Sequence, residues 1–327
     1  MPREQVSPKE AAQSVAALSK RLIQNVETVI VGKRLAVQTA LVAFFCEGHV
    51  LIEDVPGVAK TVLAKSIAKS VGCTFKRVQC TPDLLPSDIT GISVFNQKAG
   101  EFEFRPGPAF ANVLLVDELN RATPRTQSAL LECMAEGQIT IDTLTHKMAK
   151  PFLVFATQNP IEYEGTFPLP EAQLDRFCIR MRIGYPGEDD ELAMLERLRI
   201  THPVETLEQV ASAEEAVQAQ AMVKHIFVHD EVRKYAVRLV RATRSHAEIS
   251  VGASPRASIA LFRTAQALAA MNGTEYVVPD FVRLMAPAVL DHRVVLKPEA
   301  RLRRRSAADI IREIVDRVPA PAPSQTP

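Results

Sequence analysis

Five short apolar runs, separated by helical or irregular stretches, most constrain the fold of the first 187 residues. The first, third and fourth runs are almost wholly apolar, which is typical of parallel strands buried on both faces. The second and fifth carry charged side chains and fit the edges of a sheet better. Strands that alternate with helices predict a doubly wound α/β core with a five-stranded parallel sheet. The predicted strands are His49–Ile52, Thr74–Val78, Val113–Val116, Phe152–Ala156 and Ile179–Ile183.

The chain before the first strand combines two patterns. Met1–Glu10 carries prolines and glutamates and no apolar stretch, which argues against a secretory signal. Apolar residues then recur at helical spacing from Ala11 to about Phe45, with a break at Val31-Gly32-Lys33. We predict a loose N-terminal segment over residues 1–20 and a core over residues 21–187.

A change of periodicity marks a second domain after residue 187. Beyond Tyr185-Pro186-Gly187 the strand-like runs stop, and apolar residues recur at helical spacing. We therefore predict an all-α domain over residues 188–317 and a disordered, proline-rich tail over residues 318–327. The helices predicted for this domain are Glu188–Arg199, Ser212–Val223, Asp230–His246, Ser254–Met271 and Pro279–Asp291.

A candidate phosphate-binding loop follows the first predicted strand and precedes a helix. Such a loop points backbone N–H groups and a helix N-terminus at phosphate, while a lysine neutralises the phosphate oxygens and a Ser or Thr hydroxyl binds Mg²⁺. Lys60-Thr61 match the end of the pattern G-x-x-x-x-G-K-[ST], but Asp54 and Ala59 occupy its two glycine positions. Ala59 is small enough, whereas Asp54 has to point away from bound phosphates. A Pro-Gly turn followed by a chance Lys-Thr pair is the alternative interpretation.

Polar residues follow the third and fourth predicted strands. Asp117 and Glu118 come directly after a buried strand, at the end where doubly wound sheets bind ligands. Alone, they would also fit a solvated strand end. Together with the phosphate loop they predict that Asp117 holds Mg²⁺ and that Glu118 polarises the attacking water as a general base. Asn159, after the fourth strand, is placed to orient that water.

These motifs, in this order, resemble those of the MoxR-type AAA+ ATPases. The AAA+ layout is a Walker A loop, a Walker B Asp-Glu pair, a sensor-1 asparagine, an arginine finger, and a helical lid with a sensor-2 arginine. Four longer strings point to the MoxR subgroup, and the likeness runs from roughly residue 20 to residue 319. The strings are TPDLLPSDITG at 81–91, DELNRA at 117–122, ATQNP at 156–160 and PLPEAQLDRF at 168–177.

The resemblance implies a role for each candidate residue. Asp117 and Glu118 correspond to Walker B and Asn159 to sensor 1. Arg256, in the first turn of a lid helix, corresponds to sensor 2. Mg²⁺ is implied at Thr61 and Asp117, and the loop implied to bind ATP comprises Pro56, Gly57, Val58, Ala59, Lys60, Thr61 and Val62.

The resemblance also implies an arginine finger and two projecting segments. Arg176 corresponds to a finger that acts on the nucleotide of a neighbouring subunit. Arg121 and Arg125 are rivals, because they too could face a neighbour. A segment at about residues 81–108 resembles an insert in the second helix that projects toward the pore of a ring, and Gly137–Lys150 is expected to form a second hairpin.

The resemblance implies a ring-forming ATPase, expected to be a hexamer, that uses Mg²⁺ and ATP. Its implied work is chaperone-like remodelling, maturation or cofactor insertion of protein clients, with a von Willebrand factor A-domain protein as partner. A nucleic-acid motor and a chelatase-like metal-insertion subunit are alternatives from other functional classes. A neighbouring A-domain gene would favour the first interpretation, and tetrapyrrole genes the chelatase.

Composition bears on these alternatives. A net charge of +1 and the lack of an aromatic and basic stripe argue against nucleic acid as a general partner, although Arg301–Arg305 is a local basic cluster. No apolar stretch is long enough to span a bilayer, so no membrane insertion is expected. The five scattered cysteines fit reduced thiols in the cytoplasm.

Overall fold

The computed structural model describes residues 6–141, 144–159, 165–197 and 203–321. A five-stranded parallel sheet forms the centre of the core, with the strand order β2-β5-β8-β1-β9. The charged strands β2 and β9 lie at its edges and the three apolar strands lie inside, as predicted. The strands are β1 (Val50–Glu53), β2 (Phe75–Gln79), β5 (Val113–Asp117), β8 (Leu153–Gln158) and β9 (Ile179–Met181).

The register of the sheet brings the ends of its inner strands together. Ala156 on β8 pairs with Val116 on β5 and with Leu51 on β1. Because the strands are parallel, the residues that follow these three positions leave the sheet at the same edge. The candidate phosphate loop, the two carboxylates at the end of β5 and the polar end of β8 are therefore neighbours.

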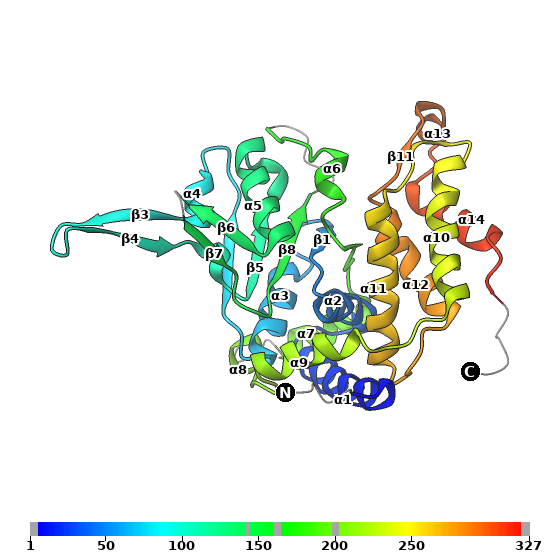
Figure 1. Ribbon diagram of the computed structural model, residues 1–327, viewed down its shortest axis with the longest axis horizontal. Coiled ribbons are helices and arrows are strands. Elements are labelled where there is room, and N and C mark those ends of the chain that lie inside the picture. The colour runs from blue at the N-terminus through cyan, green and yellow to red at the C-terminus, as the bar shows by residue number, and fades with distance from the viewer. Residues whose placement is uncertain (1–5, 142–143, 160–164, 198–202, 322–327) are drawn as a thin grey trace.

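Helices cover both faces of the sheet (Figure 1). The prediction of a loose segment over residues 1–20 was wrong, because the first helix already begins at Pro8. Ser7 and Glu10 form a capping box at that helix start. Further along the same helix, the side chains of Val15 and Leu18 are buried. The helices of the core are α1 (Pro8–Glu27), α2 (Arg34–Phe45), α3 (Lys60–Ser70), α4 (Pro86–Thr90), α5 (Pro124–Glu136) and α6 (Glu171–Leu174), with 3₁₀ turns η1 (Pro108–Phe110) and η2 (Leu119–Arg121).

Two hairpins lie outside the sheet. β3 (Gly91–Asn96) and β4 (Glu101–Pro106) pair within the predicted insert and project away from the body of the molecule (Figure 1). β6 (Gln138–Ile141) and β7 (Leu144–Lys147) form the second predicted hairpin. The two hairpins meet where Phe104 stacks on His146, with 4.2 Å between ring centroids.

The lid is helical apart from one small sheet. The unpredicted strands β10 (Ile249–Val251) and β11 (Val295–Leu296) pair antiparallel and are too short to show an alternating pattern. The end of the helix predicted over Glu188–Arg199 and most of the predicted disordered tail lie outside the described residues. The helices after the core are α7 (Glu188–Arg197), α8 (Pro203–Thr206), α9 (Ala213–Val223), α10 (Asp230–Ser245), α11 (Pro255–Met271), α12 (Pro279–Leu290), α13 (Pro298–Leu302) and α14 (Ala307–Arg317).

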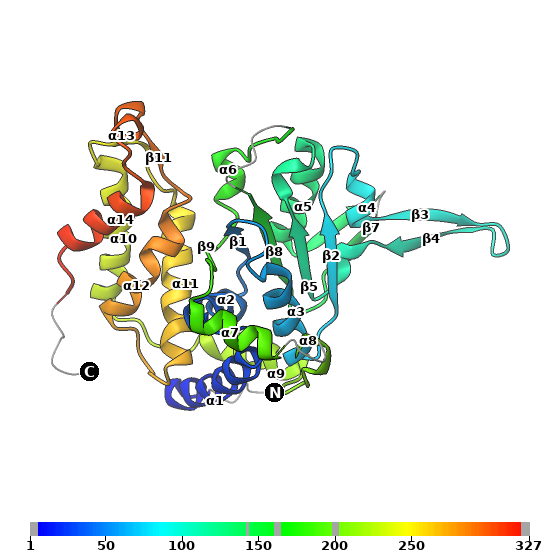
Figure 2. The ribbon, with the colours of Figure 1, turned by 180° about the vertical axis from the view of Figure 1, so that it is seen from behind.

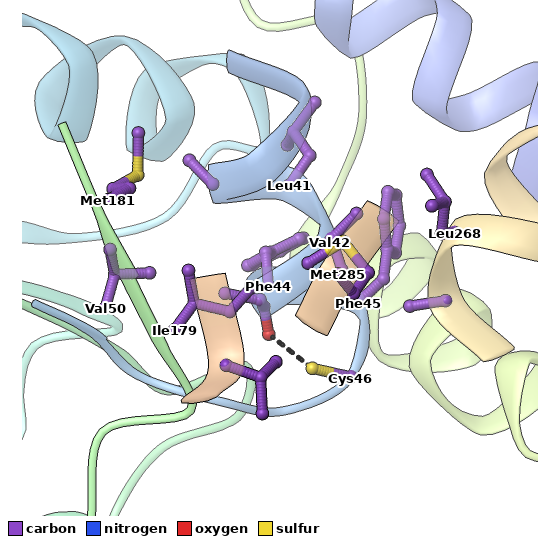
Figure 3. Packing of buried hydrophobic residues seen from close by; sticks show 14 of the residues in the cluster. Leu41, Val42, Phe44, Phe45, Cys46, Val50, Ile179, Met181, Leu268 and Met285 are labelled. Carbon is purple, nitrogen blue, oxygen red and sulfur yellow. Dashed lines mark hydrogen bonds between the residues drawn. The ribbon is translucent and has the colours of Figure 1, made fainter. Parts of the chain in front are cut away.

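One buried apolar cluster joins the core to the lid. Helix α2 lies between them, so that Phe44 and Phe45 meet Ile179 of the sheet and Leu268 and Met285 of the lid (Figure 3). Seen from behind, the lid helices α10 to α14 stand beside the core, on the side away from the β3–β4 hairpin (Figure 2). Within the described residues, no helix has both the length and the apolar character needed to cross a bilayer.

Candidate functional site

The phosphate loop connects β1 directly to the N-terminus of α3. Ala59 is the N-cap residue of that helix and adopts a left-handed conformation, with φ of 60°. Gly57 also has a positive φ, 86°, and a Cβ added there would meet no atom within 4 Å. Glycine is therefore required at this position for its backbone conformation rather than for space. The resulting loop leads the first N–H groups of α3 to the edge of the sheet, where they can bind an anion.

Asp54, at the unexpected glycine position, points away from the loop. Its side chain is buried, and Oδ2 accepts hydrogen bonds from the N–H groups of Ile183 and Gly184, both at 2.7 Å. Oδ1 accepts a hydrogen bond from the N–H of Val55 at 2.9 Å. The carboxylate therefore ties the phosphate loop to the segment after β9.

Lys60 places a positive charge in the first turn of α3. Its ammonium donates a hydrogen bond to the carbonyl of Asp54, and burial lowers its pKa below the ordinary value. The negative charges of Asp54, Asp117 and Glu118 oppose that change. The charges of Asp117, the last residue of β5, and of Glu118, the next residue, therefore act on this ammonium.

Thr157 organises the Asp117-Glu118 pair. Its hydroxyl donates to Asp117 Oδ1 at 2.5 Å and accepts the backbone N–H of Glu118 at 2.9 Å. The other oxygen of Asp117 accepts a hydrogen bond from Arg77 at 2.7 Å. Neither partner was recognised from sequence, although Thr157 lies within one of the four strings and Arg77 is one of the charged residues of the second strand.

Glu118 has a constrained backbone and two side-chain partners. It adopts a left-handed conformation, with φ of 54° and ψ of 50°. Its Oε2 accepts hydrogen bonds from Gln79 at 2.9 Å and from Arg121 at 3.3 Å. Arg121 therefore faces the Glu118 of its own chain, which weakens its case as a finger for a neighbour. Gln79, at the end of β2, is a further residue that sequence reasoning missed.

The remaining candidate residues differ in burial and in hydrogen-bond partners. Asn159 is buried and comes directly after β8. Arg176 is half-buried and donates to the carbonyl of Leu131 at 2.6 Å, whereas Arg125 and Arg256 are exposed in the first turns of their helices. Among the described residues, no hydrogen bond or ion pair joins Arg176 or Arg256 to Lys60, Asp117 or Glu118.

A cavity of about 730 Å³ lies between the core and the lid. Ile183 lines it and also binds Asp54, so the cavity adjoins the phosphate loop. Gly32 and Lys33, expected from the sequence only to break a helix, form part of the cavity wall. The wall further includes Ala36 and Thr39 of α2, Met181 and Arg182 at β9, Pro287 and Ala288 of α12, and Ser306 and Ala307 at the start of α14.

Comparisons with known proteins identify the family of the chain. The sequence profile of the ATPase family associated with various cellular activities (AAA) matches residues 49–179, and that of the AAA lid domain matches residues 241–314. Chaperone MoxR1 of Mycobacterium tuberculosis is 40% identical over 98% of this chain and 88% of its own. The chain belongs to the MoxR family of AAA+ ATPases. As a member of this family it is an ATP hydrolase.

Two further relatives cover nearly the whole chain. The uncharacterized protein YeaC of Bacillus subtilis is 49% identical over 92% of this chain and 94% of its own. The crystal structure of a Cytophaga hutchinsonii protein has a TM-score of 0.89 and 38% identity, and the alignment covers 96% of this chain and 98% of that one. The likeness therefore includes both the sheet and the lid.

The donor atoms of the site fit a magnesium nucleotide. Mg²⁺ is commonly held by one or two carboxylates and by substrate phosphates, with water completing its shell. Asp117 supplies a carboxylate and Thr61, in the first turn of α3, a hydroxyl. In the described part of the chain, no group of three or more His, Cys, Asp and Glu residues is arranged to hold a metal ion. The ion would therefore take its remaining ligands from the phosphates and from water.

Proposed function

We propose that this chain binds Mg-ATP where β1, β5 and β8 end. The observation that carries this proposal is that the loop from β1 into the N-terminus of α3, with Lys60 in its first turn, lies at the edge of the sheet where β5 ends in Asp117. Lys60 neutralises the terminal phosphates, while Thr61 and Asp117 hold Mg²⁺. The loop residues Pro56, Gly57, Val58, Ala59 and Val62 supply backbone N–H groups and the turn geometry. The base of the nucleotide fits the adjoining cavity beside Ala36 and Pro287.

Glu118 is proposed as the general base for hydrolysis. Its carboxylate accepts a proton from the attacking water, and Asn159 orients that water. Gln79 and Thr157 support this role, because one binds the side chain of Glu118 and the other its backbone. When bound, Mg²⁺ supplies positive charge at the phosphates.

The remaining steps are assigned to arginines of the ring. Arg176 acts as the finger on the nucleotide of a neighbouring subunit, and Arg125 remains the exposed rival. Arg256 contacts the nucleotide of its own subunit from the lid. We propose that the chain assembles into a ring, because each site then receives an arginine finger from the next copy of the chain. The proposed ring is a hexamer in the cytoplasm.

The proposed work of the ring is chaperone-like remodelling of protein clients. A relative that matches nearly the whole chain is named a chaperone, which supports this role. The β3–β4 hairpin offers a surface for clients, since Phe95 and Phe102 are 51% and 73% exposed near its tip. A von Willebrand factor A-domain protein is the proposed partner.

The substitution Glu118→Gln tests the catalytic proposal. The amide is almost the same size but does not accept a proton, so ATP affinity should be kept while turnover falls ~10²–10⁴-fold. Glu132→Gln, on the exposed face of α5, is the matched control and should keep both. Turnover above about a tenth of the wild-type rate would show that another residue is the base.

Copurification tests the remodelling role. The Glu118→Gln protein should retain client and A-domain proteins in the presence of ATP, and the Lys60→Ala protein should not. Stimulation of ATPase activity by DNA at ~0.15 M salt, lost in an Arg303→Ala/Arg304→Ala/Arg305→Ala protein, would instead favour a nucleic-acid motor. We expect no such stimulation, because Arg305 is already paired with Glu248 and Glu313.

A further inference from the structure

A buried arginine of the lid holds the segment that precedes β9. Arg293 follows α12, and its side chain is 2% exposed. Its guanidinium donates to Asp175 Oδ1 at 2.8 Å, to the carbonyl of Phe177 at 2.6 Å and to the carbonyl of Cys178 at 3.1 Å. One lid side chain therefore fixes the residues on both sides of Arg176.

Two other lid residues bind the same segment. Ser254, the N-cap of α11, donates its hydroxyl to Asp175 Oδ2 at 2.7 Å and accepts the backbone N–H of Arg256 at 3.0 Å. His292 Nε2 lies 3.0 Å from the carbonyl of Phe177. Burial lowers the pKa of His292 well below its ordinary value, so the neutral ring donates this bond. Both oxygens of Asp175 are thus occupied by the lid.

We propose that Asp175, Ser254 and Arg293 form a positioning junction that transmits the orientation of the lid to Arg176. The proposal rests on the assignment of Arg176 as the finger. Ser254 and Arg293 bind the segment that contains Arg176, and Asp175 accepts their hydrogen bonds, so we class all three as positioning residues. Arg256, which is proposed to contact the nucleotide of the same subunit, begins the helix that Ser254 caps.

The bonding pattern favours transmission over a purely structural role. Of the acceptors of the Arg293 guanidinium, Val289 lies within the lid, and the others lie between Asp175 and Cys178. The side chain of Arg176, by contrast, is half-buried, and its one hydrogen bond to the part of the chain that the structure describes is to the carbonyl of Leu131. The backbone of the finger therefore moves with the lid, while its side chain can change partners. In this way the nucleotide bound to one subunit controls hydrolysis in the next.

The substitution Asp175→Asn tests the junction in assembled rings. It keeps the size of the side chain and removes the charge that Arg293 binds. Because a finger displaced by about 1 Å can cost ~10²-fold, we expect kcat to fall by roughly 10- to 100-fold. KM for ATP should stay within about twofold, because the subunit's own phosphate loop is intact. An unchanged kcat would overturn the proposal.

Mixed rings separate positioning from general damage. An Asp175→Asn subunit has an intact Glu118 and a misplaced Arg176. A Glu118→Gln subunit lacks the proposed base and has a correctly placed Arg176. Rings of both, verified with two affinity tags, should regain activity where an intact site meets an intact finger. If Arg176→Ala regains activity with Glu118→Gln but Asp175→Asn does not, the junction proposal is wrong. If Arg176→Ala also regains none, the finger assignment itself has failed.

Ser254 gives a milder test that preserves the fold. Ser254→Ala removes both a helix cap and the bond to Asp175, and should lower kcat by about three- to tenfold, since a lost hydrogen bond to a charged group is of that order or larger. Ser254→Thr keeps a hydroxyl, so its kcat should stay close to that of the wild type. Ser212→Ala removes the comparable cap of α9, which does not bind the finger segment, and should leave kcat unchanged. Equal effects of Ser254→Ala and Ser212→Ala would overturn the proposal.

Discussion

Two groups of charged residues, one at the proposed nucleotide edge of the sheet and one at the lid junction, differ in exposure. At the nucleotide edge, the side chains of Asp117 and Glu118 are 17% and 29% exposed, and their partners Arg77 and Arg121 are 48% and 44% exposed. At the lid junction, Arg293 is 2% exposed and Asp175 is 15% exposed. The same kind of ion pair is therefore open to water in one region and enclosed in the other.

The difference in exposure implies that the two groups differ in how easily their ion pairs exchange partners. Exposed ion pairs contribute about 0–1 kcal/mol, so a ligand can displace Arg77 or Arg121 at little cost. Breaking a buried pair leaves an uncompensated charge and costs about 3–5 kcal/mol. The nucleotide edge is thus built to change partners, and the junction is built to move as one unit. Substitutions at the edge should alter activity more than stability, and substitutions at the junction should alter stability as well.

The largest effect is expected from Lys60→Ala. The ammonium is the main positive charge of the loop, so productive ATP binding should be abolished. Titration with fluorescent ATP at fixed Mg²⁺ checks this, and thermal unfolding of the variant should remain close to wild type. Lys65→Ala, one turn further along α3, is the matched control. Wild-type affinity in the Lys60→Ala protein would refute the assignment of the edge as a phosphate site.

Arg293→Met should give the largest loss of stability. It leaves the carboxylate of Asp175 without its buried partner, so the free energy of unfolding should fall by about 3–5 kcal/mol. Arg34→Ala removes the exposed pair with Glu27 and should cost less than about 1 kcal/mol. Denaturant titrations measure both. Equal losses would remove the contrast between buried and exposed pairs, whereas partial recovery in Asp175→Asn/Arg293→Met would sharpen it.

Arg256→Ala should have an intermediate effect, on discrimination rather than on folding. The exposed guanidinium is free to bind the terminal phosphate from the lid, and such a charged hydrogen bond is worth about 1.5–3 kcal/mol. The ratio of ADP to ATP dissociation constants should therefore fall by about tenfold or more. Arg241→Ala, exposed on α10, is the control. If ATP closes the lid equally in the variant and the wild type, as judged by distance labels, Arg256 is an ordinary surface residue.

The smallest effect is expected from Arg77→Gln, and the direction in which the Mg²⁺ requirement changes distinguishes two roles for this arginine. Arg77 binds the carboxylate proposed to hold Mg²⁺, so its removal should lower the Mg²⁺ concentration needed for half-maximal activity by about two- to fivefold. Lys76→Gln, the neighbouring exposed residue of β2, should leave it unchanged. A higher Mg²⁺ requirement would mean that Arg77 assists the nucleotide instead of competing for Asp117.

The sequence predicted the sheet because each strand had a local signature. Apolar runs marked the inner strands, and charges on β2 and β9 marked the edges. The prediction failed where the signal was weak or was misread. β10 and β11 are too short to show alternation, and the polar residues around Glu10 looked loose although Ser7 and Glu10 match a capping box.

The partners of the site residues depended on information that a single strand does not contain. Lys60, Asp117 and Glu118 were recognisable from motif and position. Arg77 and Thr157 contact them only because β2, β5 and β8 are neighbours, and the order of strands is set by tertiary packing. The junction of Asp175 with Arg293 was hidden for the same reason, since these residues lie far apart in the chain.

At Glu118, the residue that suits the left-handed backbone best is not the residue proposed to support hydrolysis. A residue with a side chain costs about 1–2 kcal/mol more than glycine in this conformation. Selection for heat resistance alone would therefore favour Glu118→Gly, which relaxes the backbone and deletes the proposed base. Ala59 has a similar conformation but no proposed role for its methyl group, so Ala59→Gly offers the same relief without that loss. Engineers who seek a more durable protein should therefore vary Ala59 and keep the turn at Glu118 under a turnover screen.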